Sequence, residues 1–305
     1  MAAADPDSLA EHFEAHRTRL RAVAYRMLGS IAEADDAVQD AWLRFSRADT
    51  TSIDNLGGWL TTVVARLCLD RLRTRASRRE DLAGLQLPEP LIGPADTAEM
   101  DPESEVLLAD SIGLAMLVVL ERLSPAERLS FVLHDTFGLP FDDIGRVIDR
   151  TPEAARQLAS RGRRRVRGAI APAHVSRARQ RELVDAFLAA ARAGDFEGLL
   201  RVLDPDVIRR ADVGALRVPF GSERETRGAA AVAKQALTFR QLAAHARPVT
   251  INGTAGLVVF SGARPFSVLA FAFGGRPGHE RIVEIDILVD PERLARLDLS
   301  AVALD

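Results

Sequence analysis

The sequence is short of lysine, cysteine and long apolar runs, and each shortage excludes something. Lys234 is the only lysine among 40 basic residues, a skew that GC-rich codon usage explains without a chosen role for every arginine. The single cysteine, Cys68, cannot form an internal disulfide, so a reducing cytoplasm is the expected compartment. No apolar run approaches the roughly 20 residues of a membrane helix. Residues 1–11 have acids and no apolar core, unlike a signal peptide.

The charged residues are unevenly distributed along the 305 residues, although the net charge is only −3. Residues 65–79 hold six arginines and one acid, residues 80–110 hold nine acids and no base, and residues 154–167 hold six arginines and no acid. One basic segment is typical of a solvated helix face, but two of them around an acidic connector favour an anionic partner. Because 47% of the residues are hydrophobic, we expect two or three packed globular domains.

The first 80 residues are expected to be helical. Apolar residues recur at i, i+3, i+4 and i+7 from Val38 to Phe45, which predicts a buried stripe. The opposite, acidic face consists of Asp35, Asp36, Gln39 and Asp40. Asp36 and Asp40 repel each other at i, i+4, a cost that a cationic partner would remove, although an ordinary solvated face fits equally well.

A second helix is expected from about Trp59 to Arg75, after the break at Gly57–Gly58. Its arginines become more frequent toward the C-terminal end, where they suit both the helix dipole and a phosphate backbone. Cys68 is expected to be a small buried residue on its apolar side rather than a nucleophile. Prolines then make residues 81–106 a linker, and helix is expected again over residues 106–123.

Residues 124–167 predict short helices joined by a tight turn. Ser124-Pro125-Ala126-Glu127 has the capping residue, first-position proline and later glutamate of a helix start. A helix over residues 141–148 meets the turn Asp149-Arg150, and Thr151-Pro152-Glu153 opens the next helix. Two such helices and their turn describe a helix-turn-helix, which places its second helix in the DNA major groove.

The second of these helices has two different sides, at about 100° per residue. The expected buried side is small or apolar and consists of Ala155, Leu158, Ala159, Gly162 and Val166. The expected exposed side consists of Glu153, Arg156, Gln157, Ser160, Arg164 and Arg167, flanked by Arg161, Arg163 and Arg165. Arg and Gln read guanine and adenine edges, and the flanking arginines suit phosphates. Short helix pairs also occur in proteins that bind no DNA, but this polarity favours DNA binding.

In their order and spacing these motifs resemble those of the extracytoplasmic-function (ECF) sigma factors, over about residues 10–170. Asp-Asp-Ala-Val-Gln-Asp-Ala-Trp at residues 35–42 resembles the region 2 helix that docks on the clamp helices of RNA polymerase β′. Residues 59–73 resemble the helix that meets the −10 promoter element. Residues 123–167 resemble region 4, which reads the −35 element and meets the β flap. An Asp at 149 stands where the inter-helix turn of the family often has Gly.

The resemblance implies roles for particular residues. Core polymerase would meet Asp35, Asp36, Gln39 and Asp40. The −10 element would meet Asn55, Arg66, Arg73, Arg75 and Arg78. The −35 element would meet Thr151, Arg156, Gln157, Ser160, Arg161, Arg163 and Arg164. A flipped −10 base would enter the loop at residues 50–58, where Asn55 would hydrogen-bond its edge and Trp59 would either stack or pack as a buried residue. The acidic connector would run along the channel of the nascent RNA.

The last 130 or so residues predict a third domain. Helix is expected over residues 182–191 and in a short segment ended by Asp204-Pro205, followed by strands at 249–251, 256–261, 265–273 and 281–289. Asn252-Gly253 and Gly274-Gly275 are turn signals. Residues 193–200 resemble the opening of SnoaL-like domains. The expected fold is therefore multidomain, with two all-α helical sigma domains (8–80 and 107–171, the second with the helix-turn-helix), the linker (81–106) and a C-terminal α+β SnoaL-like cone-shaped domain (177–300).

Three short segments resemble motifs of the ECF subgroup in which such an extension takes part in regulation. Leu-Pro-Glu-Pro at residues 87–90 resembles a Trp-Leu-Pro-Glu-Pro linker, with Gln86 in place of Trp. Asp-Val-Gly-Ala at 212–215 resembles part of an Asp-Gly-Gly-Gly segment, and Asp-Pro-Glu-Arg-Leu at 290–294 resembles an Asn-Pro-Asp-Lys-Leu end motif. The regulatory residues so implied are Asp212, Asp290, Pro291 and Leu294.

The C-terminal domain is expected to be a binding and packing module rather than an enzyme. Its titratable candidates are Asp212, His245, His279 and Asp286, but no acid–base pair can be placed at a defined spacing. An enzyme fused to a DNA-binding module stays a rival, as does a conventional helix-turn-helix regulator, which leaves the N-terminal domain without a purpose. The expectation is a cytoplasmic sigma factor that binds core polymerase and promoter DNA without cofactor, metal or membrane. A small ligand of the C-terminal domain stays open.

Overall fold

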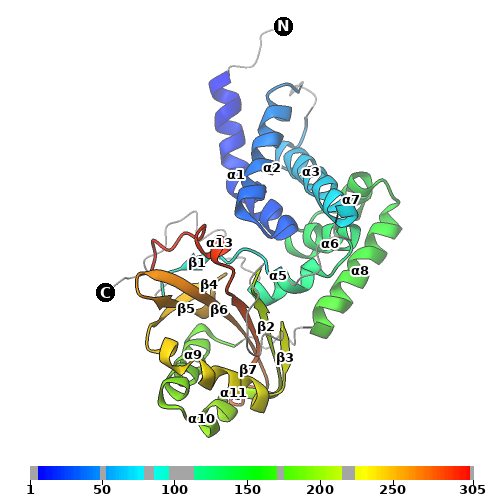
Figure 1. The fold of residues 1–305 in the computed structure, drawn as a ribbon. Helices are drawn as coiled ribbons and strands as arrows, with labels where there is room; N and C mark the ends of the chain where they lie inside the picture. The colour runs from blue at the N-terminus through cyan, green and yellow to red at the C-terminus, as the bar shows by residue number, and fades with distance from the viewer. Residues whose placement is uncertain are drawn as a thin grey trace. The chain divides into compact units, whose positions relative to one another are not determined.

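The computed structural model describes residues 6–48, 53–78, 86–95, 113–169, 175–214 and 224–302. The chain divides into two compact units (Figure 1). The first contains residues 1–83 and 119–169, and the second contains residues 84–118 and 170–305. Both helical segments with sigma-like motifs therefore belong to the first unit, whereas the described part of the connector belongs to the second.

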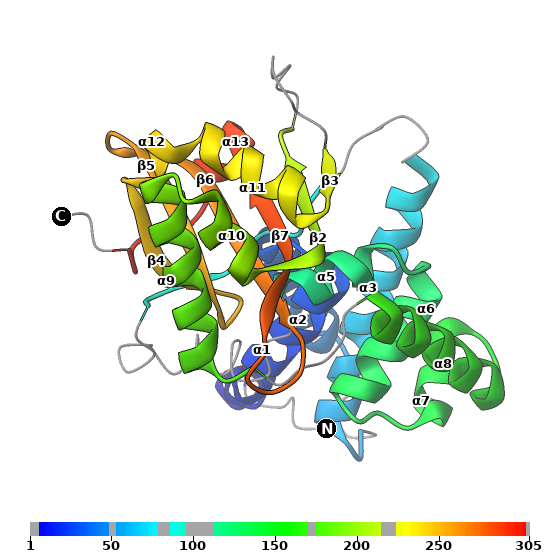
Figure 2. The same ribbon diagram turned by 90° about the horizontal axis from the view of Figure 1, so that it is seen from below.

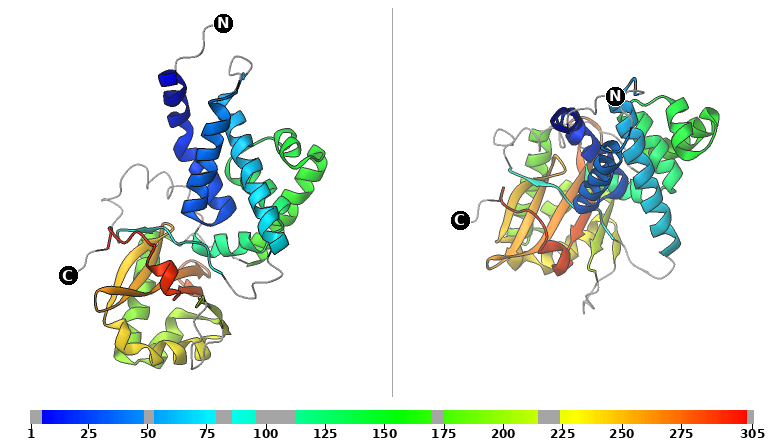
Figure 3. Two further views of the ribbon diagram at one scale, coloured as in Figure 1. Left: turned by 45° about the horizontal axis from the view of Figure 1, so that its top comes forward. Right: turned by 90° about the horizontal axis from the view of Figure 1, so that it is seen from above.

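The first unit is helical. Its N-terminal part consists of α1 (Pro6–Leu28), α2 (Ile31–Phe45) and α3 (Leu56–Arg78). These three helices lie side by side in the left view of Figure 3. After α5 (Leu114–Glu121), the second part consists of α6 (Pro125–Phe131), the π-helix η4 (Val132–Thr136), α7 (Phe141–Ile148) and α8 (Pro152–Ala169).

An aromatic cluster closes the core of α1–α3. The ring centre of Phe45 lies 6.1 Å from that of Trp59 and 6.2 Å from that of Phe13, and Trp42 lies 5.2 Å from Phe13. Phe13 and Phe45 are buried and Trp59 is half-buried. Aromatic pairs at these distances add to the stability that burial provides. Trp59, for which the sequence left base stacking open, is therefore part of this core.

The second unit packs helices on a seven-stranded sheet. The helices are α9 (Arg177–Ala193), α10 (Phe196–Val202), α11 (Ala229–Thr238), α12 (Arg240–Ala243) and α13 (Pro291–Leu294). The strands are β1 (Ile92–Gly93), β2 (Leu203–Asp212), β3 (Glu225–Arg227), β4 (Ala246–Ile251), β5 (Thr254–Ser261), β6 (Arg264–Gly274) and β7 (Arg281–Leu288). Their order is β1-β4-β5-β6-β7-β2-β3, and among these described strands only β2 and β7 pair in parallel.

Helices α9, α10 and α11 lie over one face of this sheet (Figure 2). Beneath them Phe187 of α9 packs edge-on against Phe271 of β6, with ring centres 5.5 Å apart, and Phe273 lies 6.5 Å beyond. Leu257 and Ile285 complete the same apolar cluster from β5 and β7. This apolar cluster packs the helices against the sheet.

The predicted fold class is confirmed: the helical segments of the first unit are followed along the chain by a C-terminal α+β domain. Strands β4 to β7 follow the predicted alternating runs, and Asn252 and Gly253 have φ values of 49° and 72°, as the expected tight hairpin turn requires. Strands β1, β2 and β3 and helix α11 have no counterpart in the sequence-based expectations. The short helix was expected to end at Asp204-Pro205, but α10 ends at Val202 and these two residues lie inside β2, which begins at Leu203.

Candidate functional site

The helix-turn-helix is formed by α7 and α8. Asp149 ends α7 in the left-handed conformation, with φ 56° and ψ 50°, so aspartate performs the role that glycine often has in this turn. Gly145 permits the turn to fold back, since a Cβ there would lie 2.7 Å from the carbonyl oxygen of Arg150. Gly162 permits α8 to approach α6, since its Cβ would lie 3.0 Å from that of Phe131. Gly162 thus allows α8 to pack closely against α6.

The predicted division of α8 into two sides is confirmed. Ala155, Ala159, Gly162 and Val166 are buried and Leu158 is half-buried. The polar side is exposed and presents Arg156, Gln157, Ser160, Arg161 and Arg164. The side chain of Arg167 lies outside the described residues. We call the exposed residues Arg156, Gln157, Ser160, Arg161 and Arg164 the reading face.

Three residues at the margins of the reading face have structural partners of their own. The Oγ1 of Thr151 accepts a hydrogen bond from the amide of Ala154 at 3.2 Å and so caps α8. Arg163 donates to Asp135 at 2.6 Å, and this hydrogen bond raises the pKa of Arg163. Arg165 pairs with Glu127 at 2.6 Å. Thr151 and Arg163 therefore help to hold α8 in place.

The acidic face of α2 is partly neutralised within the molecule. Asp35 pairs with Arg21 at 2.6 Å, and Asp40 pairs with Arg71 at 2.7 Å. Both carboxylates remain about half exposed, at 51% and 46%. Asp36 is exposed and forms no ion pair with another described residue, which leaves it the most available charge on this face.

Two of the predicted −10 arginines on α3 are engaged inside the first unit. Arg66 donates to the carbonyl oxygen of Arg146, at 2.8 Å, and thereby joins α3 to α7. Arg75 donates to the carbonyl oxygen of Leu28, at 3.0 Å, and also pairs with Glu33. These contacts occupy part of each guanidinium. Arg66 is exposed and uses one Nη group, whereas half-buried Arg75 uses both of its Nη groups.

The other predicted −10 residues differ in availability. Asn55 was expected to offer its amide to a base, but its Oδ1 accepts from the amide of Gly58 at 3.0 Å and caps α3. Arg73 is exposed, 3.7 Å from Asp70. The side chain of Arg78 lies outside the described residues. Because the Oδ1 of Asn55 accepts from Gly58, its Nδ2 group is the part of the side chain that remains to donate a hydrogen bond.

Arg128 is the largest fully buried side chain of the first unit and joins its two parts. Its Nε and Nη2 donate to the carbonyl oxygen of Arg26 in α1, at 3.1 and 3.0 Å, and its Nη1 pairs with Glu121 at 2.8 Å. Burial lowers the pKa of Arg128, while the charge of Glu121 opposes that shift. Cys68 is also fully buried, and burial raises the pKa of its thiol to about 12, so it stays neutral as expected.

In the second unit, Asp212 and Arg293 hold the linker by the backbone N–H and C=O of one residue, Leu87. The amide of Leu87 donates to Asp212 at 2.9 Å, and the carbonyl oxygen of Leu87 accepts from Arg293 at 2.6 Å. Asp212 and Arg293 also pair with each other. Asp212 and Leu87 are each 2% exposed. We call this arrangement the linker clasp.

The linker continues from the clasp along the edge of the sheet. Asn252 exchanges two hydrogen bonds with Leu91, at 2.8 and 3.1 Å, next to the β1–β4 pairing. Thr250 donates to the carbonyl oxygen of Pro94 at 3.1 Å, and Arg181 donates to that of Ala95. The linker from residue 87 to residue 95 thus lies along the C-terminal domain, which binds it at Leu87, Leu91, Pro94 and Ala95.

The three motif segments of the linker and C-terminal domain meet at the clasp. The amides of Val289 and Asp290 both donate to the carbonyl oxygen of Asp212, at 2.8 and 3.2 Å. Asp290 caps α13, in which Pro291 is the first residue and Leu294 is buried. Gly214 has φ 56°, and a Cβ on it would collide with Asp290. Although the segment 212–215 matches the Asp-Gly-Gly-Gly motif only in part, it has glycine at position 214, where the backbone conformation requires it.

Asp212 and Asp286, two of the titratable residues considered for an enzyme, both pair with arginines. Asp286 lies 3.5 Å from Arg210, which also pairs with Glu225 at 3.1 Å and with Glu284. Arg210, Glu284 and Asp286 are all buried. Asp212 belongs to the clasp. His279 lies in the exposed turn between β6 and β7, outside the strands β2, β3 and β7 that carry this cluster.

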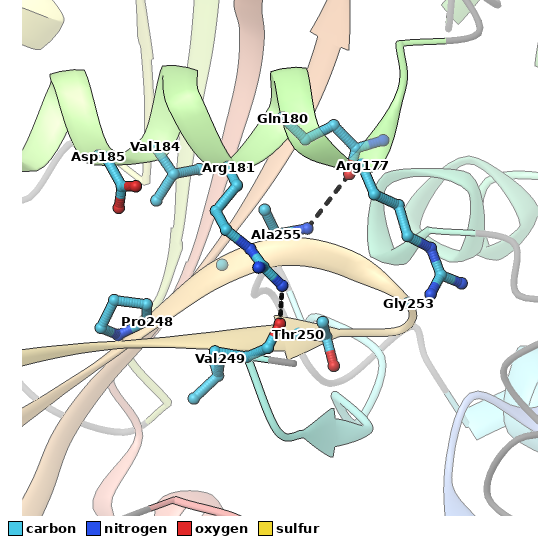
Figure 4. A pocket seen from close by; sticks show the side chains of 12 residues that line it. Arg177, Gln180, Arg181, Val184, Asp185, Pro248, Val249, Thr250, Gly253 and Ala255 are labelled. Atoms are coloured by element: carbon cyan, nitrogen blue, oxygen red, sulfur yellow. Dashed lines mark hydrogen bonds between the residues drawn. The ribbon is translucent and has the colours of Figure 1, made fainter. Parts of the chain in front are cut away.

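One hollow lies between α9 and the β4–β5 hairpin, and it has room for about 20 Å³ (Figure 4). Arg177, Arg181 and Asp185 line it from α9, and Gln180 closes its floor by accepting from the amide of Ala255 at 3.3 Å. A space of this size holds about one water molecule.

Within the described ranges, no cluster of three or more His, Cys, Asp or Glu side chains could hold a metal ion. Among the same residues, no helix has the length and apolar character to span a membrane.

Comparison with known proteins bears on both units. Residues 12–78 match Sigma-70 region 2, and residues 114–166 match Sigma-70, region 4. The ECF RNA polymerase sigma factor SigJ of Mycobacterium tuberculosis is 43% identical over 227 residues, which are 70% of each chain. The probable ECF RNA polymerase sigma factor SigI of the same species is 41% identical over 72% of this chain and 74% of its own. The crystal structure of the M. tuberculosis ECF sigma factor SigJ matches with a TM-score of 0.73 and 33% identity, over 94% of this chain and 98% of that one.

Proposed function

The chain belongs to the extracytoplasmic-function family of RNA polymerase sigma factors, and on that premise we propose which of its residues bind core polymerase, read the promoter and restrain initiation. Members of this family direct promoter-specific transcription initiation and are not enzymes as a class. A conventional helix-turn-helix regulator would leave the region 2 match over residues 12–78 unexplained. The cytoplasm, where core polymerase acts, is the compartment that this role implies.

Region 4 reads the −35 element through the reading face of α8. The observation that supports this is the exposure of Arg156, Gln157, Ser160 and Arg164 on one side of a helix whose other side is packed. Arginine binds guanine O6 and N7 in a bidentate manner, and glutamine binds adenine N6 and N7. Region 4 also meets the β flap of the polymerase in this proposal.

The function is tested by transcription from purified core polymerase, full-length protein and a library of promoters with varied −35 sequences. We expect initiation only when the protein is present, with a defined −35 preference. Arg156→Ala should cost about 1–3 kcal/mol of discrimination at one base pair and leave core binding unchanged. The matched control is Arg240→Ala, an exposed arginine of α12. Loss of the proposed function would appear as no initiation on any promoter and no binding to core.

Region 2 docks its acidic α2 face on the clamp helices of β′, with Asp36 as the available charge. Asp36→Arg replaces an attraction with a repulsion, so we expect about tenfold weaker core binding, or ~1.4 kcal/mol. Fluorescence titration of core polymerase measures the change. Asp185→Arg, at an exposed carboxylate of α9, is the control and should leave affinity unaltered. Equal affinities of the Asp36 variant and the natural protein would exclude this docking face.

The C-terminal domain restrains initiation by holding the linker. In the family the linker runs along the channel of the nascent RNA, and residues 87–95 cannot lie there while they follow the C-terminal domain. Release of the clasp therefore precedes assembly on core polymerase. The domain acts as a binding module, because its buried carboxylates Asp212 and Asp286 are committed to arginines.

A further inference from the structure

A stack of three side chains runs from the half-buried His134 of η4, through Phe141, to Arg156 on the reading face. The guanidinium carbon of Arg156 lies 5.3 Å from the ring centre of Phe141, the first residue of α7. On that ring His134 also stacks, with ring centres 3.9 Å apart and an angle of 28° between the planes. The three residues come from three successive elements, η4, α7 and α8.

The inner end of the stack is fixed by the backbone. His134 lies in the π-helix η4 and its Nδ1 is 3.0 Å from the carbonyl oxygen of Leu139, an arrangement in which Nδ1 donates the hydrogen. The chain then turns through Gly138, whose φ is 69°, so that Phe141 returns over the histidine ring. π-Helical turns of this kind occur often at functional sites. Here the turn sets the position of His134, and His134 supports Phe141.

The outer end of the stack is an arginine that would otherwise be disordered. An arginine side chain has many rotamers, and fixing them on binding reduces affinity. A guanidinium placed over an aromatic face is attracted to it, and the attraction strengthens when water is excluded. Among the described residues of the reading face, no ring supports Arg164 or Gln157 in this way. Arg156 is therefore the member whose direction is set before DNA arrives.

We propose that Phe141, supported by His134, is a positioning residue that aims Arg156 at a base of the −35 element and thereby sets specificity there. The proposal rests on the proposed function, in which α8 reads this element. Phe141 itself need not touch DNA. Its removal should lower discrimination at the base pair that Arg156 reads, and at no other.

The test is a double-mutant cycle between Phe141→Leu and Arg156→Ala in the holoenzyme. The probe is a promoter selected from a −35 library, together with its single-base variants, and the readout is the ratio of their affinities. Phe141→Leu should reduce discrimination at one base pair by about two- to fivefold, the size of an exposed cation–π contact. It should add nothing to Arg156→Ala, because the two changes remove the same interaction. Phe141→Tyr keeps the ring and should keep discrimination.

Several outcomes separate positioning from a general structural effect. Equal loss of affinity for every −35 variant, or additive losses in the cycle, would overturn the proposal. The proposal would also be overturned if Arg156→Ala alters the ratio of affinities and Phe141→Leu does not. In that case Arg156 would still read the base, but without help from Phe141. His134→Leu should give the same base-specific loss as Phe141→Leu, and a cycle of Phe141→Leu with Gln157→Ala should be additive. If the natural holoenzyme shows no −35 preference at all, the proposed function fails together with the inference.

Discussion

Replacing Arg128 with methionine should lower the free energy of unfolding of the first unit by about 3–5 kcal/mol, the cost of removing one member of a buried ion pair. The guanidinium is 2% exposed and satisfies both Glu121 and the carbonyl oxygen of Arg26. Methionine fills a similar volume but donates no hydrogen bond. The carboxylate of Glu121, itself only 15% exposed, would lose its ion pair with Arg128.

The Arg128 variant should also loosen the contact between regions 2 and 4. Arg128 belongs to α6, whereas Arg26 belongs to α1, so their hydrogen bonds join the two parts of the unit. Urea unfolding measures the stability, and the distance between fluorescent labels on α1 and α8 measures the separation. Adding Glu121→Gln should recover part of the lost stability, because it removes the half-buried charge that has lost its ion pair with Arg128. The control Arg122→Met changes an exposed arginine and should alter neither quantity. An Arg128 variant as stable as the natural protein would contradict the assignment.

Local features of this fold could be predicted from the sequence, because they depend on residues close together in the chain. The two sides of α8 follow from its 3.6-residue period, and the left-handed turn at Asp149 follows from the side chain that tolerates it. The hairpin at Asn252-Gly253 is local in the same sense. Each of these predictions needed no knowledge of tertiary structure.

The clasp and strand β2 could not be predicted, because their signals are not local. Leu87 meets Asp212 across 125 positions and Arg293 across 206. Within β2, Arg210 and Asp212 are charged yet buried, so the alternation that marks a strand is masked. The sequence does not identify their partners Asp286 and Arg293, because these come close to β2 only through the pairing of β2 with β7. The resemblance named Asp212, Asp290, Pro291 and Leu294, but it did not indicate that the linker is what they hold.

Arg293→Ala should release the linker from the C-terminal domain and speed the formation of initiation complexes. The substitution removes the cation that pairs with buried Asp212 and the donor that binds the carbonyl oxygen of Leu87. We expect a loss of about 3 kcal/mol, which shifts the balance between held and released linker by roughly a hundredfold. Hydrogen exchange at the amides of Leu87 and Leu91 should accelerate, because both donate to side chains of the C-terminal domain.

Two further variants make the clasp experiment decisive. Arg293→Lys keeps a cation for Asp212 but cannot hold the carboxylate and the Leu87 carbonyl oxygen in one planar fork, so its effect should be intermediate. Arg296→Ala changes an exposed arginine three residues further on and should behave as the natural protein. Faster hydrogen exchange at the two linker amides with faster initiation would establish that the domain restrains the factor. Faster exchange with slower initiation would reverse the sign, because the held linker would then be the form that core polymerase accepts.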